Sequence, residues 1–209
     1  RQRQMCIRDS ANADGSDIRI VDEAGNQLPL YIEYWNATSG IAVVWTNVTL
    51  AQSQKLYIYY GNPTATSVSD GKQVFLFFDD FDDFDTTVWQ IPSNPANGKV
   101  VVQDSVLHLI PYADGNQVRV NTIDMLSYTY CILESKMWWG NVSNTGERSW
   151  LKYHDPTGTY YVMMGLFNDL GTVYARTTYY DGTWHPLNIY DVDELSPHVY
   201  SIERNNDTY

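Results

Sequence analysis

The chain has 209 residues, of which 44% are hydrophobic and 18% are charged, and its formal net charge is −12. This apolar fraction suffices for a packed core and excludes global disorder. With 13 Lys and Arg against 25 Asp and Glu, the composition disfavours nucleic acid and anionic membrane surfaces as partners. The longest apolar runs have about five residues, whereas a membrane-spanning helix needs about 20, so we expect no membrane insertion.

The first ten residues, RQRQMCIRDS, differ in charge and pattern from the chain that follows. They resemble the translated sequencing-adapter string that recurs at the ends of metagenomic reading frames. We therefore expect residues 1–10 to be a non-native leader and leave Cys6 out of the fold. Cys131, in YTYCILESKM, is then a lone thiol, which we expect to be buried in a strand.

Residues 17–63 read as four short strands with turns between them. The first alternates, with Ile18 and Ile20 on one side. Pro29 places the start of the second at a sheet edge or strand start. The four predicted segments are DIRIVD (17–22), LPLYIEYW (28–35), GIAVVWTNVTL (40–50) and KLYIYYGNP (55–63). The polar stretch 64–73 then reads as a linker or long turn.

The stretch VFLFFDDFDDFD, residues 74–85, runs from apolar residues into five aspartates. We expect its first half to be the opening strand of a second domain, anchored by Phe75, Phe77 and Phe81. Three interpretations of the aspartates stay open, namely a structural calcium site, a solvated acidic turn and a catalytic cluster. The residues proposed for calcium are Asp79, Asp80, Asp82 and Asp83.

The rest of the chain contains a longer series of strand-like segments separated by turn signals such as Asn97-Gly98 and Asp181-Gly182. Strands at this spacing indicate a sandwich or jelly roll. We expect an all-β fold throughout. The predicted segments are VWQIP, KVVVQDSVLHLIPY, QVRVNT, YTYCILESKMWWG, RSWLKYHD, TYYVMMGLF, TVYARTTYYDG and VYSIERNND.

Four motifs in the first part occur together: an Asp-Ile-Arg strand, a Leu-Pro-x-x-Ile-Glu strand, a Val-Trp strand and a Tyr-Tyr-Gly-Asn-Pro turn. With them, residues 14–81 resemble the domain-of-unknown-function family numbered 2341. That resemblance implies no reaction. The motifs stand at Asp17–Arg19, Leu28–Glu33, Val44–Trp45 and Tyr59–Pro63.

Later segments, FFDDFDDFDTTVWQI, VLHLIP and YYDGTWHPLNIY…HVYSIERNNDT, resemble the concanavalin A-like and laminin G-like jelly rolls. This resemblance implies a small antiparallel β domain at residues 11–70, followed by a concanavalin-like β-sandwich at 71–209. In such jelly rolls, closing strands follow a segment like HVYSIERNND. We therefore expect the sandwich to be truncated, incomplete at the C-terminus. The resemblance also implies a setting in a larger secreted or cell-surface protein.

Catalytic chemistry has little support in the sequence. Glycoside hydrolysis needs two carboxylates across a cleft, and the Glu-x-Asp-x-(x)-Glu strand of related jelly-roll hydrolases does not occur. Glu134 has no acidic partner two to four residues away, and the four histidines lack zinc-ligand spacing. Serine-nucleophile, P-loop and dinucleotide motifs do not occur either.

Aromatic residues offer a binding surface instead. They gather in consecutive predicted strands, where some would align across one sheet face and stack on sugar rings. The alternative is that alternate members fill the core and the others are scattered over the surface. Because Trp138 and Trp139 are adjacent, only one can point inward. The candidate glycan-binding residues are Trp138, Trp139, Trp150 and Tyr153.

The sequence thus favours a non-catalytic recognition or adhesion module, with carbohydrate or other surface proteins as partners. One alternative is a structural spacer of a surface assembly. Another is a fragment of a carbohydrate-active enzyme whose catalytic residues are absent here. Four Asn-x-Ser/Thr sequons favour an extracellular or cell-surface location. They begin at Asn36, Asn47, Asn141 and Asn206.

Overall fold

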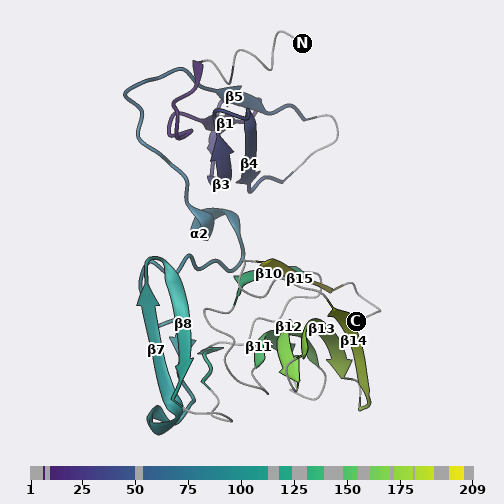
Figure 1. Cartoon of the computed structure of the whole chain (residues 1–209). Coiled ribbons are helices and arrows are strands. Elements are labelled where there is room, and N and C mark those ends of the chain that lie inside the picture. Colours follow the sequence, from purple (N-terminus) through teal and green to yellow (C-terminus); the bar gives the residue numbers. More distant parts are fainter. Residues whose placement is uncertain are drawn as a thin grey trace. The chain divides into compact units, whose positions relative to one another are not determined.

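The computed structural model describes residue 7 and residues 10–49, 54–112, 118–123, 131–138, 148–154, 161–169, 172–180, 182–190 and 198–204. The described part is all-β, as predicted, and its strands pair antiparallel (Figure 1). Backbone contacts divide the chain into two compact units, Arg1–Asp80 and Phe81–Tyr209. We call these the N-terminal unit and the C-terminal unit.

The N-terminal unit contains a three-stranded sheet of order β2-β1-β5 and the hairpin β3-β4. Ile18, Ile20 and Leu30 are buried and form its core. Pro29 separates β2 from β3, which agrees with the expected strand start. The strands are β1 (Arg19–Val21), β2 (Gln27–Leu28), β3 (Leu30–Asn36), β4 (Ile41–Thr46) and β5 (Tyr57–Tyr59).

The stretch 64–73, expected to be a linker or a long turn, belongs to this unit, so it is not a linker between the two units. Val68 packs against the core, and Ser69 forms a parallel bridge with Leu30. The backbone N–H of Asp70 donates to the Leu30 carbonyl oxygen over 2.8 Å. The segment folds onto β3 because these contacts satisfy backbone groups at the edge of that strand.

The predicted strand at residues 74–81 is also absent from this described stretch. The short helix α2 (Gly71–Val74) begins after the N-cap Asp70 and is followed by bends. Phe75 and Phe78 stack on each other with ring centroids 5.7 Å apart, and both pack edge-on against Tyr31. Residues at this spacing reach one surface from a bend, but they would face opposite ways in a strand.

Phe75 therefore anchors the N-terminal unit and not, as we expected, the second domain. Phe77 also falls in the N-terminal unit. Phe81 lies in the C-terminal unit, where its ring is 5.7 Å from that of Trp89. The division between Asp80 and Phe81 comes ten residues after the expected boundary, which separates 11–70 from 71–209.

The C-terminal unit contains the four-stranded sheet β11-β12-β13-β14 and the pairs β6-β9, β7-β8 and β10-β15. Its described buried side chains include Leu166, Tyr174, Ala175 and Thr178. The strands are β6 (Trp89–Gln90), β7 (Gly98–Gln103), β8 (Val106–Pro111), β9 (Asn121–Thr122), β10 (Cys131–Met137), β11 (Arg148–His154), β12 (Tyr161–Asp169), β13 (Thr172–Tyr180), β14 (Trp184–Tyr190) and β15 (His198–Arg204), and a 3-10 helix, η1, spans Pro95–Asn97.

Two strand assignments differ from the sequence prediction. Residues 99–112 form a hairpin rather than one strand, with Asp104 and Ser105 both at φ 54° in the turn. Strand β14 was not predicted, because Pro186 interrupts the strand pattern of 184–190. Proline is accommodated there because β14 lies at the edge of the described sheet.

Cys131 is the first residue of β10, so the strand expected around it is confirmed. Its side chain lies outside the described residues, and its burial stays a prediction. Most of the expected leader, including Cys6, lies outside them as well.

A search of the described residues for a helix long and apolar enough to cross a membrane finds none.

Candidate functional site

The four aspartates proposed for calcium are divided between the units. Asp79 and Asp80 belong to the N-terminal unit, and Asp82 and Asp83 to the C-terminal unit. Asp82 accepts a hydrogen bond from the Ser105 hydroxyl over 2.6 Å. Within the described stretches, no group of three or more His, Cys, Asp or Glu side chains could hold a metal ion. The calcium site stays a prediction, which a melting temperature unchanged by chelator would contradict.

The four aromatic residues proposed for glycan binding are described only in part. Trp138 directly follows β10 and is half-buried. Trp150 and Tyr153 lie in β11, paired with Gly165 and Val162 of β12. Trp139 and the side chains of Trp150 and Tyr153 lie outside the described residues, so a glycan site at these positions stays a prediction.

Two of the four motifs of the N-terminal unit, the Asp-Ile-Arg strand and the Gly-Asn-Pro turn, meet at Asp17, whose side chain is 3% exposed. Its Oδ1 accepts the backbone N–H of Asn12 over 2.8 Å. Its Oδ2 accepts the backbone N–H groups of Gly61 and Asn62 over 2.5 and 3.2 Å. One carboxylate thus joins the loop before β1 to the Gly-Asn-Pro turn after β5. We call this arrangement the Asp17 clasp.

The clasp favours the ionised form of Asp17. Burial alone raises the pKa of this carboxyl, but the N–H donors of Asn12, Gly61 and Asn62 together outweigh that effect. The pKa of Asp17 therefore lies below its ordinary value. A carboxylate held this way is a structural group, because its hydrogen bonds direct its oxygens to backbone rather than to a ligand.

Arg19, from the same motif, also binds backbone. Its guanidinium donates to the carbonyl oxygens of Ser16, Ile18 and Thr66 over 2.9, 2.8 and 2.7 Å. The motif residues Asp17, Arg19 and Gly61 therefore hold segments of the N-terminal unit together. Their described contacts explain the fold and do not form a ligand site.

A different arrangement occurs on one face of the sheet in the C-terminal unit. Side chains two apart in a strand share a face, and the register pairs Arg176 with Asn188, Thr178 with Pro186 and Tyr180 with Trp184. On this face β13 carries two polar side chains between two tyrosines, and β14 carries Trp184, Pro186 and Asn188. We call this the aromatic face. It comprises Tyr174, Arg176, Thr178, Tyr180, Trp184 and Asn188.

Hydrogen bonds orient the polar part of the aromatic face. The Arg176 Nε donates to the Asn188 Oδ1 over 2.8 Å. A second guanidinium nitrogen donates to the Tyr174 hydroxyl over 2.8 Å, and the guanidinium carbon lies 5.0 Å from the centroid of that ring. Arg176 and Asn188 are half-buried, so a fixed cation and a fixed amide lie side by side at this face.

The aromatic part lies at the end of the same strands. The rings of Tyr180 and Trp184 are 5.2 Å apart at an interplanar angle of 57°, and Trp184 is 54% exposed. Tyr180 lies four positions after Arg176, which is about 13 Å along a strand. Thr178, between the two pairs, is buried, so the exposed part of this face is the Tyr180–Trp184 ring pair.

Thr178 lies between these two groups. It is 2% exposed, and its hydroxyl has no hydrogen-bond partner among the described residues. Leaving a buried hydroxyl unsatisfied costs about 1–3 kcal/mol. The centre of the aromatic face therefore carries an unused polar group, in contrast to the Asp17 carboxylate.

A usable signal for this site was present in the sequence, and our prediction did not use it. In YYDGTWHP, the Asp-Gly pair marks a hairpin turn, and Gly182 has φ 105° in the structure. A hairpin there places Tyr180 opposite Trp184. Our candidate residues stood instead on the earlier strands, where tryptophan is denser.

Comparison with known proteins finds a match to one family model. Residues 14–92 match the model of a family described as "Domain of unknown function (DUF2341)", in agreement with the resemblance of the N-terminal part. No curated protein and no solved structure matches the chain.

Proposed function

We propose that this chain is a non-catalytic recognition or adhesion module that binds glycans through the aromatic face of its C-terminal unit. The observation that carries the proposal is the exposed Trp184 ring beside Tyr180, on the same sheet face as the Arg176–Asn188 pair. Glycans present both apolar C–H surfaces and rows of hydroxyl groups. Flat aromatic surface packs against the C–H surfaces, and oriented donors and acceptors bind the hydroxyl groups.

The same proposal includes a fold and a setting for the C-terminal unit. β10 pairs with β15 across a long stretch of sequence, while β11 to β14 pair in chain order. This combination supports a jelly-roll sandwich of the concanavalin A-like or laminin G-like kind. Asn47, which begins a sequon, is exposed, as a glycosylated residue of a secreted or cell-surface protein would be.

A glycan array probed with the full chain tests the proposal. Trp184→Ala removes the exposed ring from the aromatic face. We expect it to weaken binding to any glycan that the unchanged chain binds, at least about tenfold. Leu187→Ala is the matched control, since Leu187 is 62% exposed on the same strand but points to the opposite face. Binding should survive this second change.

Two results would contradict the proposal. One is an array on which the chain binds no glycan. The other is equal binding of the array by the unchanged chain and by Trp184→Ala. If Trp138→Ala and Trp139→Ala abolish binding while Trp184→Ala does not, the site lies at the residues first indicated by the sequence.

A further inference from the structure

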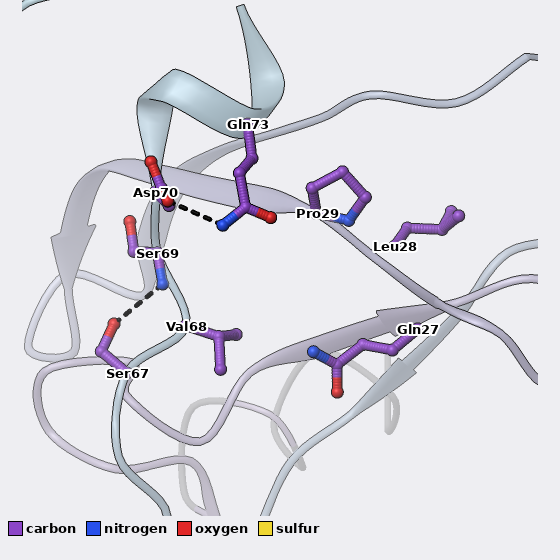
Figure 2. A pocket seen from close by; sticks show the side chains of 8 residues that line it. All are labelled: Gln27, Leu28, Pro29, Ser67, Val68, Ser69, Asp70 and Gln73. Carbon is purple, nitrogen blue, oxygen red and sulfur yellow. Dashed lines mark hydrogen bonds between the residues drawn. The ribbon is translucent and has the colours of Figure 1, made fainter.

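A pocket in the N-terminal unit has no role in the functions considered so far. Its volume is about 480 Å³, and it is partly open to solvent and mostly polar. Two chain segments about 40 residues apart form its walls, and Figure 2 shows how their side chains converge. The lining residues are Gln27, Leu28, Pro29, Ser67, Val68, Ser69, Asp70 and Gln73.

Backbone bonds hold the two walls together. The Asp70 N–H donates to the Leu30 carbonyl oxygen over 2.8 Å, and the Ile32 N–H donates to the Ser69 hydroxyl oxygen over 2.8 Å. Leu28 and Val68 also pack against the buried core. The pocket is therefore formed before a ligand binds, and binding loses little conformational entropy of the protein.

The side chains of α2 set the polarity of one wall. The Gln73 Nε2 donates to the Asp70 Oδ2 over 2.7 Å. This bond fixes the carboxamide, because its nitrogen must face the carboxylate. Figure 2 shows the Gln73 oxygen turned away from Asp70, on the side of Pro29, as an oriented acceptor.

The facing wall adds a second carboxamide, from Gln27. This exposed side chain forms no hydrogen bond with any other described residue, so both its donor and its acceptor are available to a ligand. Ser67 adds a hydroxyl at the rim, while Leu28, Pro29 and Val68 supply apolar surface. The pocket thus offers donors, acceptors and a small apolar area together.

The charge of the lining narrows the ligand class. Among the described residues, Asp70 is the one charged residue that lines the pocket. Each of its carboxylate oxygens already accepts a bond, from the Lys72 N–H and from the Gln73 side chain. An anion would be repelled by this carboxylate and would find no lining cation. An organic cation would compete for oxygens that both already accept hydrogen bonds. A neutral ligand with several hydroxyl groups matches both carboxamides.

We propose that this pocket binds a neutral polyhydroxylated unit, one or two sugar residues in size. The site lies wholly within the N-terminal unit, so it does not depend on glycan binding at the aromatic face. The pocket would give the N-terminal unit a ligand, whereas the described contacts of its motif residues stabilise the fold.

Titration of the isotope-labelled full chain, followed by backbone amide NMR shifts, tests this site. The probes are glucose, galactose, mannose, N-acetylglucosamine, maltose and cellobiose, with glucose 6-phosphate and choline as charged comparisons. We expect at least one neutral sugar to shift amides of residues 27–30 and 67–73. The charged probes should shift them less or not at all.

Substitutions then assign the effect to the pocket. Gln73→Ala and Gln27→Ala should each weaken the neutral sugar about tenfold, since each removes oriented hydrogen bonds. Lys72→Ala is the matched control, because Lys72 is exposed on the same helix and does not line the pocket. Gln27→Ala keeps the test valid if Gln73→Ala disturbs α2, since the Gln27 side chain forms no hydrogen bond with any described residue.

Three outcomes overturn the proposal: no neutral sugar shifts the pocket amides, a charged probe binds there more tightly, or both glutamine variants leave the affinity unchanged. Shifts confined to residues 174–190 would also overturn it while supporting glycan binding at the aromatic face. Conversely, pocket shifts that persist in Trp184→Ala would support the pocket whatever happens at that face.

Discussion

Two buried polar side chains, Asp17 in the N-terminal unit and Thr178 in the C-terminal unit, differ in their hydrogen bonding, although the Trp35 indole N–H of the N-terminal unit is also buried without a described partner. In the N-terminal unit, the Asp17 carboxylate is buried and accepts three backbone N–H groups from two distant segments. In the C-terminal unit, the Thr178 hydroxyl is buried without a described partner, beside a row of oriented polar and aromatic groups. The first pattern stabilises a fold, and the second leaves a polar group uncommitted next to an exposed ring pair.

This difference shows how motifs should be interpreted. The Asp17, Arg19 and Gly61 positions carry the resemblance of the N-terminal part, yet their described hydrogen bonds all join side chain to backbone within that unit. A motif of this kind reports a folding requirement. The pocket residues Gln27 and Gln73 of the same unit lie outside the four motifs.

The largest expected effect tests whether the two units are also energetic units. Leu30 is 1% exposed in the N-terminal unit, and Leu166 is 0% exposed in the C-terminal unit. Replacing either with alanine leaves a cavity and should cost about 3 kcal/mol of unfolding free energy. We expect hydrogen exchange to rise in 18–46 for Leu30→Ala and in 161–190 for Leu166→Ala. Faster exchange in both units from one substitution would show that they unfold together.

The second prediction tests the Asp17 clasp. Asp17→Asn replaces one carboxylate oxygen with an NH₂ group, which cannot accept a hydrogen bond from the backbone N–H groups that face it. The substitution should cost roughly 2–3 kcal/mol of unfolding free energy. Urea unfolding followed by exchange of residues 17–61 measures the loss, with the exposed Glu23→Gln as control. If the Asp17→Asn variant is as stable as the unchanged chain, the carboxylate contributes little.

The pH dependence of this unit should follow from the same group. Because the folded pKa of Asp17 is lowered, its contribution is complete above the pKa of an unfolded aspartate, about 3.9, and is lost as pH falls through the lower folded value. Acid unfolding of residues 17–61 should therefore shift to higher pH in Asp17→Asn. Equal acid midpoints would contradict this link.

The sequence predicted the strands of the N-terminal unit well, because their alternation is simple. Ile18 and Ile20 are both buried, as expected from their spacing, and Val44 packs against the core. The strand at residues 74–81 was predicted incorrectly for a physical reason. Its apolar run has no period that separates a strand from a bend, and only tertiary contacts with Tyr31 and Trp45 decide between them.

The candidate site was harder to predict than the fold. The aromatic face depends on cross-strand register, which pairs Tyr180 with Trp184 and Arg176 with Asn188. Composition and spacing along one strand do not contain that register, which only the Asp181-Gly182 turn signal indicates. The pocket was harder still to predict, because Gln27 and Gln73 line one pocket only once residues 64–73 have folded back onto β3.

The next prediction uses backbone conformation in the N-terminal unit. Gly15 has φ +72°, and a Cβ there would lie 2.7 Å from the Trp35 ring, whereas at Gly25, with φ +87°, it would meet nothing within 4 Å. We expect Gly15→Ala to cost about 2 kcal/mol, from left-handed strain and overpacking together. Gly25→Ala should cost only the strain, about 1 kcal/mol. Equal losses in thermal or urea unfolding would show that Trp35 moves aside freely.

The smallest expected effect concerns the corresponding feature of the C-terminal unit, where Asp104 and Ser105 adopt φ 54° without being glycine. This pair joins β7 to β8, with Gln103 opposite Val106, and both residues have the positive φ of a type I′ turn. Asp104→Gly should therefore stabilise the hairpin by about 0.5–1 kcal/mol, because glycine adopts positive φ without the Cβ clash. Asp104→Ala should lower stability slightly, since alanine keeps the clash and loses the hydrogen bond that the aspartate accepts from the Gln103 side chain.

Hydrogen exchange across 98–111 measures both changes, and opposite signs are the expected result. If both variants shift exchange in the same direction, the turn is not strained. Positive φ at Asp104 and Ser105 then costs no stability relative to the positive φ of Gly15 and Gly25.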